Sequence, residues 1–227
     1  MYNIYISYLG RPEGDPVRGS AMNLLGVGLH DAEHYEDALS VMEAELSVKR
    51  RHGASEEHIL RMQGNLASTY AKLGRHEESM SLERDVYSGR LKLFGEEQYE
   101  TLVAANNYAS SLNGLERFEE AKALFRKIIP VAQRILGESS DLTLRMRWIY
   151  ARALYADPGA TLDDLREAVG ALEETERIGR RVLGGAHPLT SAFERHSRHA
   201  RDALAAREGG DVSSVCDGVA AMTPGDA

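Results

Sequence analysis

The sequence predicts an all-α fold: a solenoid, or α-α superhelix, of about four antiparallel helical hairpins followed by one capping helix. Two observations support this fold class. Three sequence blocks recur in the same order along the 227 residues, and apolar or small residues inside the blocks follow the i, i+1, i+4 spacing of one helical face. The hydrophobic fraction of 43% and the charged fraction of 27% are ordinary for a globular chain.

The repeat is clearest around the glycines that follow helical runs. They stand at positions 53, 95, 137 and 184, which are 42, 42 and 47 residues apart. The surrounding text aligns as KRRHGASEEH, KLFGEEQYET, RILGESSDLT and RVLGGAHPLT. Two further sets of blocks recur. One set is AEHYEDAL, GRHEESMS, ERFEEAKA and LDDLREAV, and the other is LLGVGL, NLASTY, NYASSL and IYARAL. Such self-similarity at a fixed period is typical of repeat proteins.

Each repeat is interpreted as two helices. In the first helix Tyr70, Ala109 and Ala151 are expected to be buried, and the small residues let a neighbouring helix approach closely. The second helix opens with two acidic residues, which suit the positive end of the helix dipole, and its closing glycine is expected to be a left-handed cap. Breaks between paired helices are predicted near residues 31–34, 74–75, 114–117 and 156–162.

Two irregularities and a terminal helix complete the pattern. Pro130 falls inside a second helix, where its missing N–H and its ring predict a kink. The fourth repeat carries five extra residues in its turn, ADPGATLDD. Residues 189–208 are predicted to form one more amphipathic helix, suited to capping the stack.

These paired helices resemble tetratricopeptide repeats, with a period of about 42 residues in place of the usual 34. That period, with Leu183-Gly184 followed by His187-Pro188 and Thr190, is similar to the kinesin light chain subclass. The resemblance covers roughly residues 20–208. It implies a concave surface, lined by the first helices, that binds peptides.

Three segments follow from this reading. Residues 1–18 are an N-terminal extension, residues 19–208 the repeat domain, and residues 209–227 a tail that is rich in Gly, Ser and Asp and lacks a helical period, so we expect it to be disordered.

The stretch HDAEH, residues 30–34, fits the zinc motif H-x-x-E-H, which requires both histidines on one continuous helix. In the repeat alignment the stretch falls on the turn between two helices, with His30 ending one and His34 opening the next. His196 and His199 are spaced H-x-x-H on the terminal helix, but no third ligand is evident nearby. We therefore predict neither a metal site nor a cofactor.

Other function classes find little support. There is no Gly-rich phosphate loop, nucleophile elbow or Cys–His arrangement, so an enzyme is not expected and no catalytic residue is assigned. The net charge of -8 argues against nucleic-acid binding. No apolar run approaches the ~20 residues of a membrane span. The single cysteine, Cys216, is consistent with a reducing, cytoplasmic location.

A second stripe of residues runs beside the packing face of each first helix, with spacings of mainly three and four. The predicted peptide-binding residues are Arg61, Asn65, Ser68 and Lys72 in the second repeat, Asn106, Asn107, Ser110 and Asn113 in the third, and Arg145, Trp148, Arg152 and Tyr155 in the fourth. Asparagine can donate and accept hydrogen bonds, which suits a peptide backbone. Paired guanidiniums favour a carboxylate.

We therefore predict a non-enzymatic scaffold or adaptor that binds an extended, acidic peptide, with contacts centred on the fourth repeat and Asn106 and Asn107 holding the backbone further along. Three alternatives stay open. In the first, the stripe is only a solvated face. In the second, Trp148 packs under the terminal helix while Arg145 and Arg152 pair with local acids. In the third, the protein self-associates or is a structural section of a larger protein, and the apolar stretch MYNIYISYL, residues 1–9, pairs with another chain.

Overall fold

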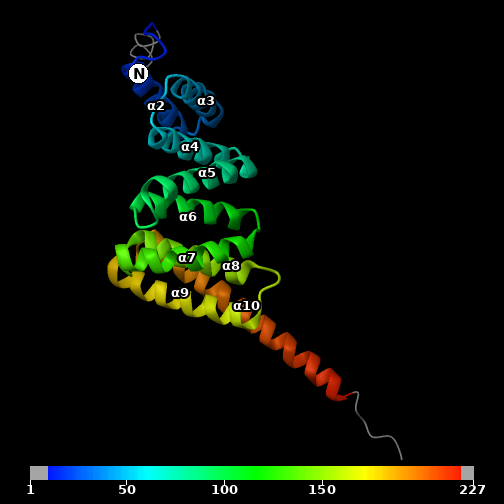
Figure 1. Ribbon diagram of the computed structural model, residues 1–227. Coiled ribbons are helices and arrows are strands. Elements are labelled where there is room, and N and C mark those ends of the chain that lie inside the picture. The colour runs from blue at the N-terminus through cyan, green and yellow to red at the C-terminus, as the bar shows by residue number, and fades with distance from the viewer. Residues whose placement is uncertain (1–9, 221–227) are drawn as a thin grey trace, which may run out of the picture. The chain divides into compact units, whose positions relative to one another are not determined.

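The computed structural model describes residues 10–220, and the side chains of residues 10–209. All regular structure in this range is helical (Figure 1). The helices are α2 (Pro16–Asp31), α3 (Tyr35–Arg51), α4 (Glu56–Lys72), α5 (His76–Phe94), α6 (Tyr99–Gly114), α7 (Phe118–Leu136), α8 (Asp141–Ala156), α9 (Leu162–Val182) and α10 (Pro188–Ala220). No described helix is long and apolar enough to cross a membrane.

The chain divides into two compact units, Met1–Leu115 and Glu116–Ala227. The first unit contains α2 to α6 and the second α7 to α10. Within each unit consecutive helices pack side by side, and in the second unit α10 also contacts α8 (Figure 1). The predicted all-α architecture of stacked helical hairpins is confirmed in both units.

The predicted breaks between paired helices are confirmed. The helices are interrupted at residues 32–34, 73–75, 115–117 and 157–161. In the first break Glu33 has a φ of 64°, a left-handed conformation that ends α2 before α3 begins. The stretch HDAEH therefore lies on a turn and not on one continuous helix.

The longer turn of the fourth repeat ends in a capping box. The Thr161 hydroxyl accepts a hydrogen bond from the Asp164 amide at 3.1 Å, and the Asp164 carboxylate accepts one from the Thr161 amide at 3.0 Å. This reciprocal pair satisfies two N–H groups that a helix start leaves unbonded. The longer turn therefore leads into a well-capped N-terminus of α9.

The glycines that end the second helices correct one detail of the prediction. Gly95 and Gly137 have φ values of 80° and 87°, which a side chain would strain, but ψ values of 175° and 160°. A left-handed helical cap has ψ near ~47°. The expected αL cap is therefore wrong at these two sites, although the requirement for glycine stands.

Two further expectations concern Pro130 and the terminal helix. Helix α7 continues through Pro130, whose side chain is exposed, to Leu136 without a break, and the kink at Pro130 stays a prediction. The predicted terminal helix is present as α10, which extends beyond residue 208 to Ala220 and so includes residues 209–220, where no helix was expected. The removable tail stays a prediction, and residues 1–9 and 221–227 lie outside the described part of the chain.

Each unit has its own apolar core. In the first unit Met42, Leu46, Met62 and Leu66 form a buried cluster. In the second unit the corresponding cluster is Leu144, Ile178 and Phe193. Ala109 and Ala151 are fully buried, as predicted. Tyr70 is only half-buried, because its hydroxyl reaches out to hydrogen-bond with the exposed Glu43.

Candidate functional site

The predicted stripe on α4 lies largely at the surface. Arg61, Ser68 and Lys72 are exposed, and Asn65 is half-buried. The Arg61 guanidinium lies 3.0 Å from Nδ1 of His58, one turn earlier on the same helix. The α4 face therefore offers polar groups and two cations.

The predicted stripe on α6 divides into two. Asn106 and Asn113 are buried, at 8% and 4% exposure, and the Asn106 Oδ1 has no hydrogen-bond partner among the described residues. Asn107 is exposed and Ser110 half-buried. The part of this stripe that reaches the surface is therefore Asn107 and Ser110.

On α8 the four predicted residues have different surroundings. Arg145 is exposed and pairs with Asp141 at 2.7 Å, one turn earlier. Trp148 packs against α10, its ring 5.9 Å from that of Phe193 and 5.2 Å from that of His196. These two contacts match the alternative in which Trp148 lies under the terminal helix and Arg145 pairs locally. Arg152 and Tyr155 extend the same face toward the end of α8.

Tyr155 is fixed by a contact with the terminal helix. Its hydroxyl lies 2.5 Å from Nδ1 of His196. Burial lowers the pKa of His196 to about 4, with the nearby positive charges of Arg195, His199 and Arg152 acting in the same direction. His196 is therefore neutral at physiological pH, and its Nδ1 can accept a hydrogen bond from the tyrosine hydroxyl.

Two arginines act electrostatically on this pair. Arg152 from α8 and Arg195 from α10 both lie close enough to oppose the rise that burial causes in the Tyr155 pKa. Both also contribute to the lowered pKa of His196. Among residues 10–209 neither guanidinium has an ion pair. We call Trp148, Arg152, Tyr155, Arg195 and His196 the α8–α10 cluster.

The cluster combines aromatic rings that are tilted against one another with two cations that have no ion pair among residues 10–209. Guanidiniums bind carboxylates through paired, charge-assisted hydrogen bonds. Aromatic rings beside them supply apolar contact area, and Trp, Tyr and Arg are the residues most enriched at binding hot spots. Chemically, the arrangement can bind an anion that carries or adjoins an apolar group.

Sequence reasoning found three members of the cluster, on α8, and missed Arg195 and His196. The H-x-x-H spacing on the terminal helix singles out His196 in the sequence, but that spacing indicates a metal motif and not a contact with Tyr155. His199 does lie next to His196, with ring centroids 5.8 Å apart. No group of three or more potential metal-ligating His, Cys, Asp or Glu side chains occurs in the described part of the chain.

Comparison with known proteins agrees with the geometry. Residues 59–100 and 101–141 match the family model of the tetratricopeptide repeat. Among curated proteins, no sequence matches the chain significantly.

Solved structures with the same fold include a candidate kinesin light chain of Podosopora anserina with nearly identical TPR-like repeats, at 21% identity and a TM-score of 0.70, covering 87% of this chain and 92% of that one. BtubC (BKLC) from P. vanneervenii shares 16% identity, with a TM-score of 0.69 over 94% of this chain and 87% of its own. A Rap protein complexed with Competence and Sporulation Factor has a TM-score of 0.55 and 16% identity, over 89% of this chain and 57% of that one.

The fold defines the class first: an all-α protein built from stacked helical hairpins. The family match and the structural neighbours then specify it. Residues 59–141 match the tetratricopeptide repeat, and the solved structures named above share the same helical fold over most of the chain. Repeats of this kind form extended surfaces that serve as scaffolds for protein interaction.

Proposed function

We propose that this protein is an interaction scaffold that binds an extended, acidic peptide segment of a partner protein, and that the α8–α10 cluster is the centre of the contact. The single observation that supports this best is the pair Arg152 and Arg195. Arg152 lies between Trp148 and Tyr155 along α8, Arg195 precedes His196 on α10, and neither arginine has an ion pair among the described residues. In a chain of net charge -8, two such cations form a distinct local positive field.

The neighbouring groups would assist the two arginines. Tyr155 and His196 are half-buried and joined to each other, so little conformational freedom is lost when a ligand packs on them. Arg145 is engaged with Asp141, but both groups are exposed, and an exposed ion pair contributes only ~0–1 kcal/mol. A ligand carboxylate can therefore compete for Arg145.

In the first unit, we propose that exposed polar groups of the predicted stripes contact peptide backbone. These are Arg61, Ser68 and Lys72 on α4 and Asn107 on α6. Hydrogen bonds from Ser68 and Asn107 to backbone carry no sequence preference, whereas Arg61 and Lys72 also attract acidic side chains. The buried Asn106 and Asn113 would take part only if their helix faces became accessible.

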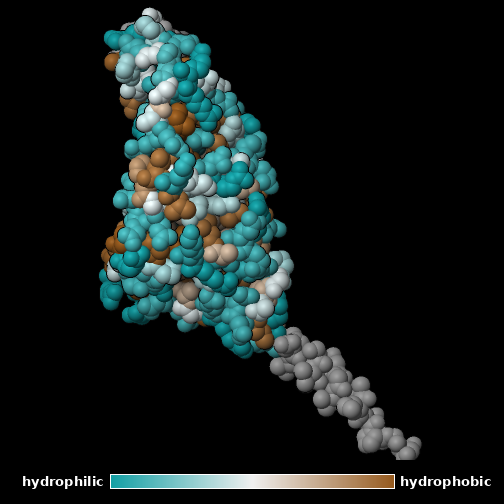
Figure 2. All heavy atoms as spheres, in the orientation of Figure 1, coloured by the Kyte–Doolittle hydropathy of each residue, from teal (hydrophilic) through white to brown (hydrophobic). Residues whose placement is uncertain are grey.

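The fold is compatible with ligand binding, since a Rap protein with similar architecture has been crystallised with Competence and Sporulation Factor. Fold alone does not identify a ligand. On the face shown in Figure 2, hydrophilic residues cover most of the surface and apolar residues lie between them in small groups. That distribution favours recognition through charge and individual side chains over burial of one large apolar patch.

Self-association is the second candidate, and it rests on α2. Leu24 is 70% exposed and Val17 is 46% exposed, and their spacing of seven residues puts them on one face of the helix. Light-scattering mass separates the candidates. A monomer that binds an acidic peptide supports the scaffold, whereas a dimer that dissociates on changing Leu24→Asp supports self-association.

The scaffold proposal is tested with an acidic peptide selected from a displayed library on the purified protein. Arg152→Glu and Arg195→Glu are introduced together, and affinity is measured by fluorescence anisotropy in low salt. We expect binding to weaken by about tenfold or more, because two favourable charge contacts become repulsive. The matched control changes Arg166→Glu and Arg177→Glu, two exposed arginines of α9, and should bind as the parent does.

Unchanged affinity in the double variant, with an unchanged melting temperature, would contradict the proposal. Equal loss in the variant and in the α9 control would also contradict it, because the effect would then come from net charge alone.

A further inference from the structure

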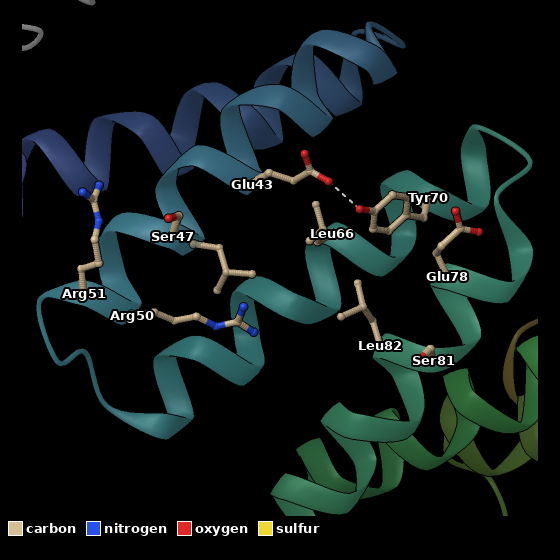
Figure 3. Close-up of a pocket in the computed structure, with 10 residues that line it drawn as sticks. Glu43, Ser47, Arg50, Arg51, Leu66, Tyr70, Glu78, Ser81 and Leu82 are labelled. Carbon is tan, nitrogen blue, oxygen red and sulfur yellow. Dashed lines mark hydrogen bonds between the residues drawn. The ribbon is translucent and has the colours of Figure 1, made fainter.

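An open pocket of about 530 Å³ lies in the first unit and is lined by the second helices α3 and α5 and by the first helix α4 (Figure 3). Its lining residues are Glu43, Leu46, Ser47, Arg50, Arg51, Leu66, Tyr70, Glu78, Ser81 and Leu82. None of the predicted α4 stripe residues is among them. The pocket is therefore a surface separate from both the predicted stripes and the α8–α10 cluster.

The base of the pocket is apolar. Leu46 and Leu66 belong to the buried core of the unit, at 6% and 4% exposure. Leu82 of α5 is half-buried and packs against the same core. An apolar side chain that entered the pocket would meet a surface already held in place by packing.

One end of the pocket is acidic. The Tyr70 hydroxyl donates to the Glu43 carboxylate at 2.5 Å (Figure 3). The Arg75 guanidinium lies over the Tyr70 ring, 4.3 Å from its centroid, and pairs with Glu78 at 2.9 Å. That ion pair holds the pKa of Glu78 below its usual value. Two carboxylates and one guanidinium leave this end with one uncompensated negative charge.

The other end is basic. Arg51 pairs with Glu13 at 2.9 Å. Arg50 is exposed and has no ion pair within the described range. This end therefore carries one uncompensated positive charge. In Figure 3 the two arginines lie on one side of the pocket, and Glu78 and Tyr70 on the other.

The two ends are a short peptide's length apart. Glu43 and Arg50 are seven residues apart on α3, which corresponds to about 10 Å along a helix. In an extended peptide alternate side chains face the same side, and residues i and i+4 are about 13 Å apart. Residues i, i+2 and i+4 of such a segment can therefore reach one end, the base and the other end together.

We propose that this pocket binds a short extended segment of a partner protein with an acidic, an apolar and a basic residue at alternate positions. The acidic side chain binds Arg50, the apolar side chain packs on Leu46, Leu66 and Leu82, and the basic side chain lies against Glu43 and Glu78. A segment carrying one sign of charge would satisfy one end and be repelled by the other. This selectivity differs from that of the α8–α10 cluster, which favours acidic peptides.

The test uses the whole chain and a labelled peptide, Asp-Ala-Leu-Ala-Lys, with blocked ends so that the termini carry no charge. Three comparison peptides replace Lys by Asp, Asp by Lys, or Leu by Gly. We expect the first peptide to bind about fivefold or more tightly than each of the others in fluorescence anisotropy. Equal binding of the all-acidic peptide would overturn the proposal, as would no detectable binding of the first.

Protein variants locate the contact. Arg50→Glu should weaken binding by about tenfold or more, because both ends of the pocket are then acidic. Adding Glu43→Lys to that variant reverses the two ends, so the peptide can bind in the opposite direction and affinity should recover. Arg84→Glu, an equal charge change on α5 away from the pocket, should have no effect. An unaffected Arg50→Glu variant, or a double variant that fails to recover while its melting temperature is unchanged, would overturn the proposal.

The result is independent of the proposed scaffold function. The variant with Arg152→Glu and Arg195→Glu leaves the first unit unaltered and should bind the mixed-charge peptide normally. Loss of mixed-charge binding in that variant would contradict the assignment to this pocket and leave the acidic-peptide experiment unaffected.

Discussion

Helices α5 and α7 are equivalent second helices, and they differ at one buried position. Both have 19 residues and end one residue before a glycine of positive φ. Phe125 of α7 is fully buried, whereas Glu83, at the same place in α5, is buried at 6% exposure with no hydrogen-bond partner on its Oε2. Burial raises the pKa of Glu83 to about 7. Equivalent positions thus share burial without sharing chemistry.

The difference has an energetic consequence for the first unit. A buried carboxylate without a partner is destabilising in its charged form, because it has lost its hydration. An aromatic ring in the same place contributes apolar burial and packing. The same fold therefore has a pH-sensitive position in α5 and a pH-insensitive one in α7.

The largest expected effect is at the aromatic side of this comparison. Phe125→Ala should lower the free energy of unfolding by about 3–5 kcal/mol, since it removes a fully buried ring and leaves a cavity. Urea unfolding followed by circular dichroism measures this directly. A loss below about 1 kcal/mol would mean that Phe125 is not the packing residue that the comparison requires.

Because Glu83 is buried, the free energy of unfolding should fall as pH rises. Its pKa is about 7 in the folded protein against a usual value of 4.5, so between these values the folded state binds a proton that the unfolded state does not. Stability from this group is therefore present at low pH and lost as pH rises through 7. The difference in pKa corresponds to about 3 kcal/mol.

Glu83→Gln is the matched control because it keeps the shape and cannot ionise. The difference in unfolding free energy between this variant and the parent should increase from pH 5 to pH 8, with the parent becoming relatively weaker. A constant difference over that range would show that Glu83 does not titrate as described.

A smaller effect is expected at a small buried residue of a first helix. Ala109 of α6 is fully buried, and Ala109→Leu should overpack its surroundings at a cost of about 1–3 kcal/mol. Ala123→Leu, on an exposed position of α7, is the control and should leave the melting temperature unchanged. Equal melting temperatures for both variants would invalidate the alignment of the repeats.

The smallest effect is expected at the C-terminus. Deleting residues 209–227 should change the free energy of unfolding by less than about 0.5 kcal/mol, because the sequence there has no periodic apolar face. Thermal melting of the shortened chain is the measurement. A shortened chain that unfolds or precipitates would show that this segment contributes to folding.

The fold was predictable because repeated spacing determines which residues of a helix face its neighbours. The spacing of the repeats places His30 and His34 on either side of a turn for that reason. The site was predictable only within one helix: Trp148, Arg152 and Tyr155 share a face of α8 by spacing alone. The contacts of Trp148 and Tyr155 with His196 depend on how α10 packs on α8, which local periodicity does not encode.

The pocket in the first unit was not predictable for the same reason. Its lining comes from three helices, and Tyr70 was expected to be buried. The hydroxyl of Tyr70 instead lies at the acidic end, where it donates a hydrogen bond to Glu43, while Arg75 lies over the ring. Charged residues at solvent-facing positions carry no periodic signal of their own, so only the packed structure shows that charges of opposite sign gather at opposite ends.

The central claim is that the α8–α10 cluster binds acidic peptide, and the fluorescence of Trp148 within the cluster tests it. Trp148 is the only tryptophan of the chain and belongs to the cluster. Titration with the selected acidic peptide should change its fluorescence saturably, with the same Kd that anisotropy gives. The change should disappear with Arg152→Glu and Arg195→Glu and persist with Arg61→Glu and Lys72→Glu in the first unit. Peptide binding that leaves Trp148 fluorescence unaltered, or that is lost only with the α4 changes, would contradict the account.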